Sequence, residues 1–243
     1  MSLIAKNLQV VKQKMQRSAQ IVARDVATIE LLAVSKTFPA QAVIEAVQAG
    51  QTCFGENYLQ EAVAKILEVD SLLAQQQQQQ QQTATQLVWH FIGPIQSNKT
   101  RPIAEHFAWV HSVDRLKIAQ RLSEQRPEQL APLNVCVQVN VSGEASKSGV
   151  APEHVLELML AIQALPKLRL RGLMCVPEAS ENPEQQKAAF AHMRSLFEQC
   201  QAQIPTLDTL SMGMSGDMEA AIAEGSTMIR IGSAIFGKRH YDN

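Results

Sequence analysis

Short apolar segments rich in β-branched residues alternate with amphipathic segments from residue 29 onward in this chain of 243 residues. In the first pair, IELLAVS is followed by PAQAVIEAVQAG, whose Val43, Ile44 and Val47 fall on one helical face and whose Gly50 suits a helix end. The other segments of the first kind are residues 52–54, 87–92, 109–113, 135–141, 168–174, 209–212 and 228–231. The alternation predicts eight strands in βα units on a parallel sheet.

Eight strands separated by helices in a chain of this length favour a closed (β/α)8 TIM barrel of the α/β class. An open doubly wound sheet is the alternative. We expect one domain over residues 1–243, with residues 3–26 as an extra N-terminal helix. A run of eight glutamines, residues 75–82, buries no apolar surface, so we interpret it as a mobile insertion in a helix-to-strand loop.

The composition argues against several classes of protein. With 22 basic and 23 acidic residues, the net charge of −1 gives no bias towards nucleic acid or anionic lipid. No apolar stretch resembles a signal peptide or a membrane span. Four scattered cysteines form no CxxC pair, and the histidines lack metal-ligand spacing. We therefore expect a cytoplasmic protein with a small-molecule partner, no membrane contact and no metal.

Two glycine-rich segments, SMGMSGD and RIGS, follow the last two predicted strands. Their backbone N–H groups and the Ser215 and Ser233 hydroxyls can turn towards one anion, where barrels of this kind usually bind phosphate. The alternative for either segment alone is that its glycines only make tight turns. Together the two segments favour a phosphate site.

Lys36 stands where the first apolar segment stops. Partial desolvation at the end of a barrel strand favours the neutral amine, which can attack a carbonyl and form a Schiff base. The alternative is a surface lysine whose charge reaches the solvent. An aldehyde that carries a phosphate satisfies both features, and pyridoxal 5′-phosphate (PLP) is the clearest candidate cofactor.

Seven motifs resemble, in order and spacing, the pyridoxal phosphate homeostasis proteins (the YggS/PROSC family) between residues 29 and 238. They are AVSKTFP, FGENYLQE, WHFIGPIQSNK, VNVSGEASKSG, LRGLMCVP, LSMGMSGDMEAAI and MIRIGSAIFG. The resemblance implies an alanine racemase N-terminal domain-like barrel, fold type III of the vitamin B6 proteins, without the second β-domain of the racemases.

The resemblance also implies roles for individual residues. Lys36 holds PLP as an internal aldimine, Asn57 lies near the ring hydroxyl, and Arg230 faces the pyridine nitrogen. The residues around the phosphate are Ser215, Gly232 and Ser233, with Ser211 close by. The residues of the pocket wall are His90 and Met174. Many members have lysine where this chain has Phe38, so any role of that lysine in cofactor transfer is missing here.

The same residues argue against catalytic turnover. An arginine beside the pyridine nitrogen leaves the ring unprotonated and a weak electron sink. Racemisation needs bases on both faces of the substrate carbon, and racemases of this fold take the second from a tyrosine of the missing domain. This chain has only Tyr58 and Tyr241. We therefore expect no catalytic residues and no enzyme activity.

Three functions remain open on the sequence. The leading one is a PLP carrier in vitamin B6 homeostasis, with PLP-dependent apoenzymes as possible recipients. The others are a PLP-dependent amino-acid racemase or decarboxylase and a Schiff-base aldolase without cofactor. A lone barrel favours a monomer, because only the racemases need a dimer to complete their sites. Lys147, in GEASKSG, belongs either to a second anion-binding loop or to a solvated turn.

Overall fold

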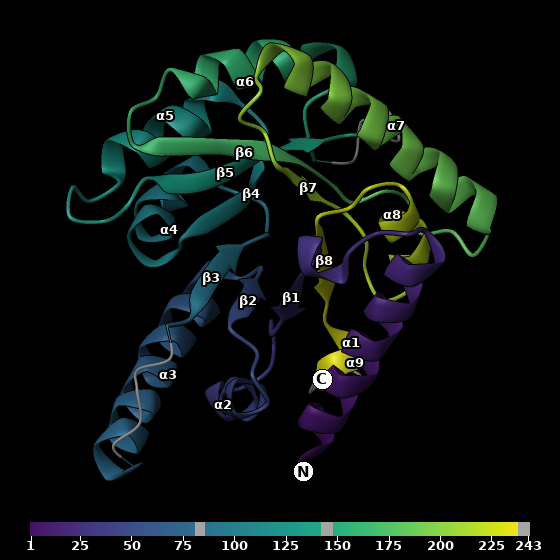
Figure 1. Ribbon diagram of the computed structural model, residues 1–243. Helices are drawn as coiled ribbons and strands as arrows, with labels where there is room; N and C mark the ends of the chain where they lie inside the picture. The colour runs from purple at the N-terminus through teal and green to yellow at the C-terminus, as the bar shows by residue number, and fades with distance from the viewer. Residues whose placement is uncertain (81–85, 142–147, 238–243) are drawn as a thin grey trace, which may run out of the picture.

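The strands close into a parallel barrel in which each pairs with the next along the chain and β8 returns to β1 (Figure 1). The computed structural model describes residues 1–80, 86–141 and 148–237. The strands are β1 (Glu30–Val34), β2 (Cys53–Glu56), β3 (Val88–Phe91), β4 (Trp109–Val113), β5 (Leu133–Val139), β6 (Leu168–Cys175), β7 (Thr209–Ser211) and β8 (Met228–Ile231). The predicted barrel is confirmed, and the open sheet is excluded.

Helices surround the barrel on its outside (Figure 1). They are α1 (Leu3–Ile21), α2 (Ala40–Gln48), α3 (Leu59–Gln80), α4 (Thr100–His106), α5 (Leu116–Gln125), α6 (Val155–Gln163), α7 (Pro183–Gln203), α8 (Met218–Ala223) and α9 (Ser233–Phe236). Short 3₁₀ turns are η1 (Val26–Thr28), η2 (Ser97–Lys99) and η3 (Pro152–His154). The N-terminal helix ends at Ile21, earlier than predicted, because Ala23 takes a left-handed φ of +53°. A short helix, α9, also follows the last strand.

Two apolar layers hold this architecture together. Outward-facing strand residues such as Phe54 and Val110 pack against apolar helix faces, including the fully buried Val43 and Ile44 of α2. Each such side chain contributes about 1.5–3 kcal/mol when fully buried. A smaller cluster fills the barrel interior. Its members are Leu32, Cys53, Trp109, Cys136, Met174 and Met228.

The glutamine run departs from the sequence prediction. Residues 75–80 are the last turns of α3, so the loop interpretation is wrong for them. Glutamine is a good helix former, and extending an existing helix avoids the cost of nucleation. Gln81 and Gln82 lie outside the described residues, as do Lys147 and Tyr241.

The amino end of the barrel is held by Arg171 of β6. Its Nε and Nη2 donate to the Asp208 carboxylate at 2.8 and 2.7 Å, and its Nη1 donates to Asn134 Oδ1 at 2.9 Å. The guanidinium also lies 4.5 Å from the centre of the Trp109 ring. The Arg171 guanidinium therefore has a carboxylate, an amide oxygen and an aromatic ring of the protein as its partners.

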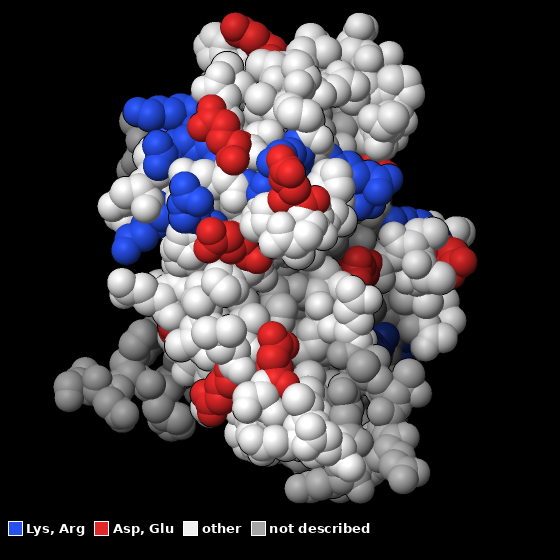
Figure 2. Space-filling model, turned by 90° about the vertical axis from the view of Figure 1, so that its left-hand side faces the viewer, with Lys and Arg blue, Asp and Glu red and all other residues white. Residues whose placement is uncertain are grey.

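Basic and acidic side chains interleave on the face shown in Figure 2. Ion pairs at the protein surface include Arg101–Glu105 and Arg115–Asp114. Among the described residues, no helix has the length and apolar character needed to cross a membrane. The mixed charge agrees with the balanced composition.

Candidate functional site

The ends of β1 and β8 bring Lys36 close to the last glycine-rich loop. Strand pairing sets Leu32 against Arg230 and Ala33 against Ile231, so the residues that follow both strands meet at the carboxyl end of the barrel. Gly232 lies so near β1 that a Cβ on it would be 3.3 Å from the Val34 carbonyl oxygen. Lys36 itself is half-buried in the turn that follows β1.

A row of hydrogen-bonded side chains crosses the barrel interior at this end. We call His90, His111, Ser211 and Arg230 the interior polar row. Arg230 Nη1 donates to Ser211 Oγ at 2.8 Å, and its Nη2 donates to the Cys175 carbonyl at 2.8 Å. Ser211 Oγ lies 2.9 Å from His111 Nδ1, and His111 Nε2 lies 2.9 Å from His90 Nδ1. Four strands thus contribute to one polar layer.

Burial controls the charge of this row. Desolvation lowers the pKa of His90 to about 3 and that of His111 well below its usual value, so both rings are neutral near pH 7. Burial also lowers the pKa of Arg230, which stays a cation. Among the described residues, Arg230 forms no salt bridge with a carboxylate. The row therefore carries one buried positive charge.

Asn57 follows β2 and offers an unused acceptor. Its Oδ1 is buried and has no hydrogen-bond partner among the described residues, and the same holds for His90 Nε2. Glycine at position 93 permits the close approach of the Asn57 backbone, because a Cβ there would lie 2.1 Å from the Asn57 carbonyl oxygen. Unpaired buried polar atoms are costly, so a ligand that pairs with them is favoured.

The loop after β7 is held close to β8. Gly213 takes a φ of +97°, and its carbonyl accepts a hydrogen bond from the Arg230 backbone N–H at 3.0 Å. The Met214 N–H donates to Asp217 at the start of α8. Ser215 lies half-buried in the turn between them. The two loops predicted to bind phosphate are therefore anchored at the same end of the barrel.

A buried charged cluster supports the turn that contains Lys36. It consists of Glu56, Glu61 and Lys65, and we call it the Lys65 cluster. Lys65 Nζ lies 2.8 Å from a carboxylate oxygen of each glutamate. It also donates to the Ser35 carbonyl at 2.8 Å, while the Ser35 hydroxyl donates to Glu56 at 2.6 Å. Burial is the main cause of a raised pKa at Glu56, and the Lys65 charge opposes it.

Sequence reasoning assigned no role to His111 or to the Lys65 cluster. His90, predicted to lie in the pocket wall, is fully buried inside the barrel, and Met174 belongs to the interior apolar cluster. A signal for His111 existed, since β4 alternates inward and outward and Trp109 and His111 share its inner face. Ser211, predicted near the phosphate, contacts Arg230 and His111.

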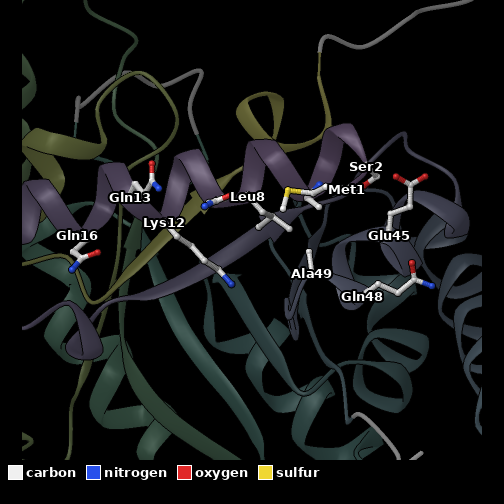
Figure 3. A pocket seen from close by; sticks show the side chains of 11 residues that line it. Met1, Ser2, Leu8, Lys12, Gln13, Gln16, Glu45, Gln48 and Ala49 are labelled. Atoms are coloured by element: carbon white, nitrogen blue, oxygen red, sulfur yellow. Dashed lines mark hydrogen bonds between the residues drawn. The ribbon is translucent and has the colours of Figure 1, made fainter.

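Other features do not join this site. A groove of about 650 Å³ lies between α1 and α2, with Lys12 and Gln13 on one side and Glu45 and Gln48 on the other (Figure 3). Its lining includes none of the predicted site residues. In the described ranges, no three His, Cys, Asp or Glu side chains are placed to hold a metal ion.

Comparison with known proteins shows the family to which this chain belongs. The family model for the alanine racemase N-terminal domain matches residues 2–240. The pyridoxal phosphate homeostasis protein of Pseudomonas aeruginosa is 60% identical over 241 residues, which cover 99% of this chain and 98% of that protein. The chain belongs to the pyridoxal phosphate homeostasis protein family. The family resemblance of the seven motifs is thereby confirmed.

Other family members agree in length and fold. The pyridoxal phosphate homeostasis protein of Escherichia coli K12 is 51% identical, and the match covers 99% of both chains. PipY of Synechococcus elongatus, solved with PLP bound, is 35% identical to this chain, and the two structures superpose with a TM-score of 0.77. The match covers 96% of this chain and all of the PipY chain. The family barrel thus spans nearly all of this chain.

Proposed function

We propose that this protein binds PLP, holds it covalently on Lys36 and serves vitamin B6 homeostasis without catalytic turnover. The observation that carries the proposal is Arg230, a cation only 4% exposed whose described partners are a hydroxyl and a carbonyl. A buried cation without a carboxylate is suited to a ligand that brings an acceptor. The pyridine nitrogen of PLP is such an acceptor, and the related PipY was solved with PLP bound.

The other polar groups fit the same ligand. The unpaired Oδ1 of Asn57 would accept a hydrogen bond from the ring hydroxyl. Ser215, Gly232 and Ser233 would hold the phosphate through backbone N–H groups and hydroxyls. Ser211 would act by orienting Arg230, to which it is already hydrogen-bonded.

Lys36 would supply the covalent link. When bound, PLP offers an aldehyde that condenses with the lysine amine, forming a C=N bond and releasing one water molecule. Half-burial of Lys36 limits the access of water to that bond. His90 and Met174 would form the deeper wall, since both lie inside the barrel.

The proposed lack of turnover is supported by the acid–base groups of the site. Arg230 keeps its proton, so the ring nitrogen accepts a hydrogen bond and stays unprotonated. Tyr58 is half exposed and lines a groove that Asn57 also lines. His90 and His111 are engaged with each other inside the barrel. We therefore assign none of these groups as the second base of a racemase.

The covalent link is tested by absorption and by borohydride reduction of the purified, PLP-loaded protein. We expect a visible band that disappears in Lys36→Ala and persists in Lys99→Ala, a lysine at the same end of the barrel. Mass spectrometry after reduction should find the cofactor on the Lys36 peptide. Reduction onto a different lysine in the wild type would contradict the proposal.

Turnover is tested by α-proton exchange in deuterated water across a panel of amino acids. We expect exchange no faster than with free PLP. Enzyme-like rates would establish a racemase or decarboxylase instead.

We also propose that the protein is a cytoplasmic monomer that passes PLP to apoenzymes. The check is the rate at which an apoenzyme is activated by the loaded protein, compared with an equal concentration of free PLP. If the loaded protein gives no advantage, the role is storage and not delivery.

A further inference from the structure

The residue after Lys36 has a strained backbone. Thr37 takes a φ of +68°, in the left-handed region. For a β-branched residue this conformation is a true outlier. Such strain persists only where surrounding contacts impose it.

The Lys65 cluster supplies those contacts. The Thr37 N–H donates to Glu61 Oε1 at 2.6 Å. On the other side of Lys36, the Ser35 carbonyl accepts from Lys65 Nζ at 2.8 Å. Both neighbours of Lys36 are therefore tied to charged side chains of one cluster.

Stability alone does not account for this cluster. Glu56 is fully buried and the Lys65 side chain is 4% exposed, yet Glu61 remains 35% exposed. Desolvation offsets much of the attraction within a buried ion pair, and apolar side chains of similar size are often at least as stabilising. A charged cluster also adds geometric specificity, because its hydrogen bonds fix the orientation of the groups that they contact.

We propose that Glu61 is a positioning residue for cofactor retention. It holds Thr37 in the left-handed conformation and so aims the Lys36 amine into the site, with Lys65 and Glu56 fixing Glu61 and Ser35 in turn. This role rests on the proposed attachment of PLP to Lys36. Without Glu61, Thr37 relaxes towards negative φ and Lys36 turns with it, so PLP is released faster.

The test compares release of PLP from loaded variants into an excess of a carbonyl-trapping reagent. Glu61→Ala should release PLP about tenfold faster, since the strain at Thr37 corresponds to about one factor of ten. Glu61→Gln keeps an oxygen that accepts from the Thr37 N–H, so it should stay within about twofold of the wild type. Glu105→Ala, which removes a carboxylate of an exposed i,i+4 ion pair far from Lys36 in sequence, serves as the control.

A glycine at position 37 distinguishes positioning from general damage. Glycine adopts positive φ without strain, so Glu61→Ala should accelerate release by less than about twofold in a Thr37→Gly background. Unchanged release in Glu61→Ala, equal acceleration in Glu61→Gln, or an undiminished effect in the Thr37→Gly background would each overturn the role of Glu61.

Borohydride reduction of the PLP-loaded wild type distinguishes failure of the Glu61 role from failure of the proposed attachment of PLP to Lys36. If PLP is not reduced onto Lys36, the proposed function fails and the positioning role with it. If PLP is on Lys36 and Glu61→Ala releases it at the wild-type rate, only the positioning role fails.

Discussion

The barrel has an arginine at each end, and the two arginines differ in their hydrogen-bond partners. Arg171, at the amino end, donates to Asp208 and Asn134 and lies over the Trp109 ring. Arg230, at the carboxyl end, is more deeply buried but donates only to a hydroxyl and a carbonyl among its described partners. One cation is satisfied by the protein, and the other has capacity left for a ligand.

The difference shows where this barrel favours stability and where it favours binding. At the amino end, the protein itself supplies hydrogen-bond acceptors for the Arg171 guanidinium. Unpaired or neutralised polar groups gather at the carboxyl end, where Asn57 Oδ1 and His90 Nε2 lack described partners. Barrel proteins generally divide their two ends in this way.

Replacing each arginine by methionine should separate the two roles most clearly. Arg230→Met should weaken PLP binding by about 10- to 100-fold, because a hydrogen bond to a charged group is lost. The free energy of unfolding of the cofactor-free protein should stay within about 1 kcal/mol, since an unpaired buried charge is removed. Arg171→Met should lower that free energy by about 2 kcal/mol and leave PLP affinity unchanged.

Urea unfolding and equilibrium PLP titration measure both quantities. Arg230→Lys, which keeps the charge but not the fork of donors, serves as an intermediate variant. The comparison breaks down if Arg171→Met weakens PLP binding as much as Arg230→Met does.

A glycine at each end extends the comparison. Gly213 has a φ of +97°, and an added Cβ would lie 2.5 Å from the Ala221 Cβ, so Gly213→Ala should cost about 2–4 kcal/mol and also weaken PLP binding. Gly50 has a φ of +81° but open space around it, so Gly50→Ala should cost about 1 kcal/mol and spare the cofactor. Thermal unfolding with and without PLP checks both, and equal losses would refute the distinction.

The two ends should also respond to different ranges of pH. His90 and His111 have folded-state pKa values below their unfolded value of about 6.5, so the unfolded state takes up protons first as the pH falls. Stability is then lost below about pH 6.5, and His90 accounts for about 2 kcal/mol of that loss between pH 7 and pH 5. His90→Asn should remove its share of this loss in urea unfolding at the two pH values.

Asp208 behaves differently within the same window. Burial alone would raise its pKa, but hydrogen bonds from Arg171 and Thr209 lower it overall, so its contribution is lost only below about pH 3.8. Arg171→Met should therefore show the wild-type loss between pH 7 and pH 5. The raised pKa of Glu56 has the opposite effect, because it increases the stability of the folded protein as the pH falls. This contribution is the same in the wild type and in the variants, so it cancels when they are compared. If the free energy of unfolding of His90→Asn depends on pH as in the wild type, the conclusion that His90 is buried in its neutral form is wrong.

Much of the fold was predictable, because strand and helix periodicities are local. The segments at 109–113 and 228–231 match β4 and β8 at both ends. The glutamine run was misjudged because composition shows that it cannot build a core, whereas a preceding helix can still extend through it. The positions of Lys36 and Gly232 just after a strand were predictable, because a motif marks each strand end, whereas their roles towards PLP stay predictions.

The sequence alone determined the alternation of strands and helices, the lysine that follows the first strand and the glycine-rich loops that follow the last two, since each depends on residues adjacent in the chain. Tertiary structure decided which side chains meet. His90 reaches His111, and Thr37 reaches Glu61, across separations of 21 and 24 residues. These contacts depend on barrel closure and on a left-handed turn that threonine disfavours locally, so only the assembled fold can select them.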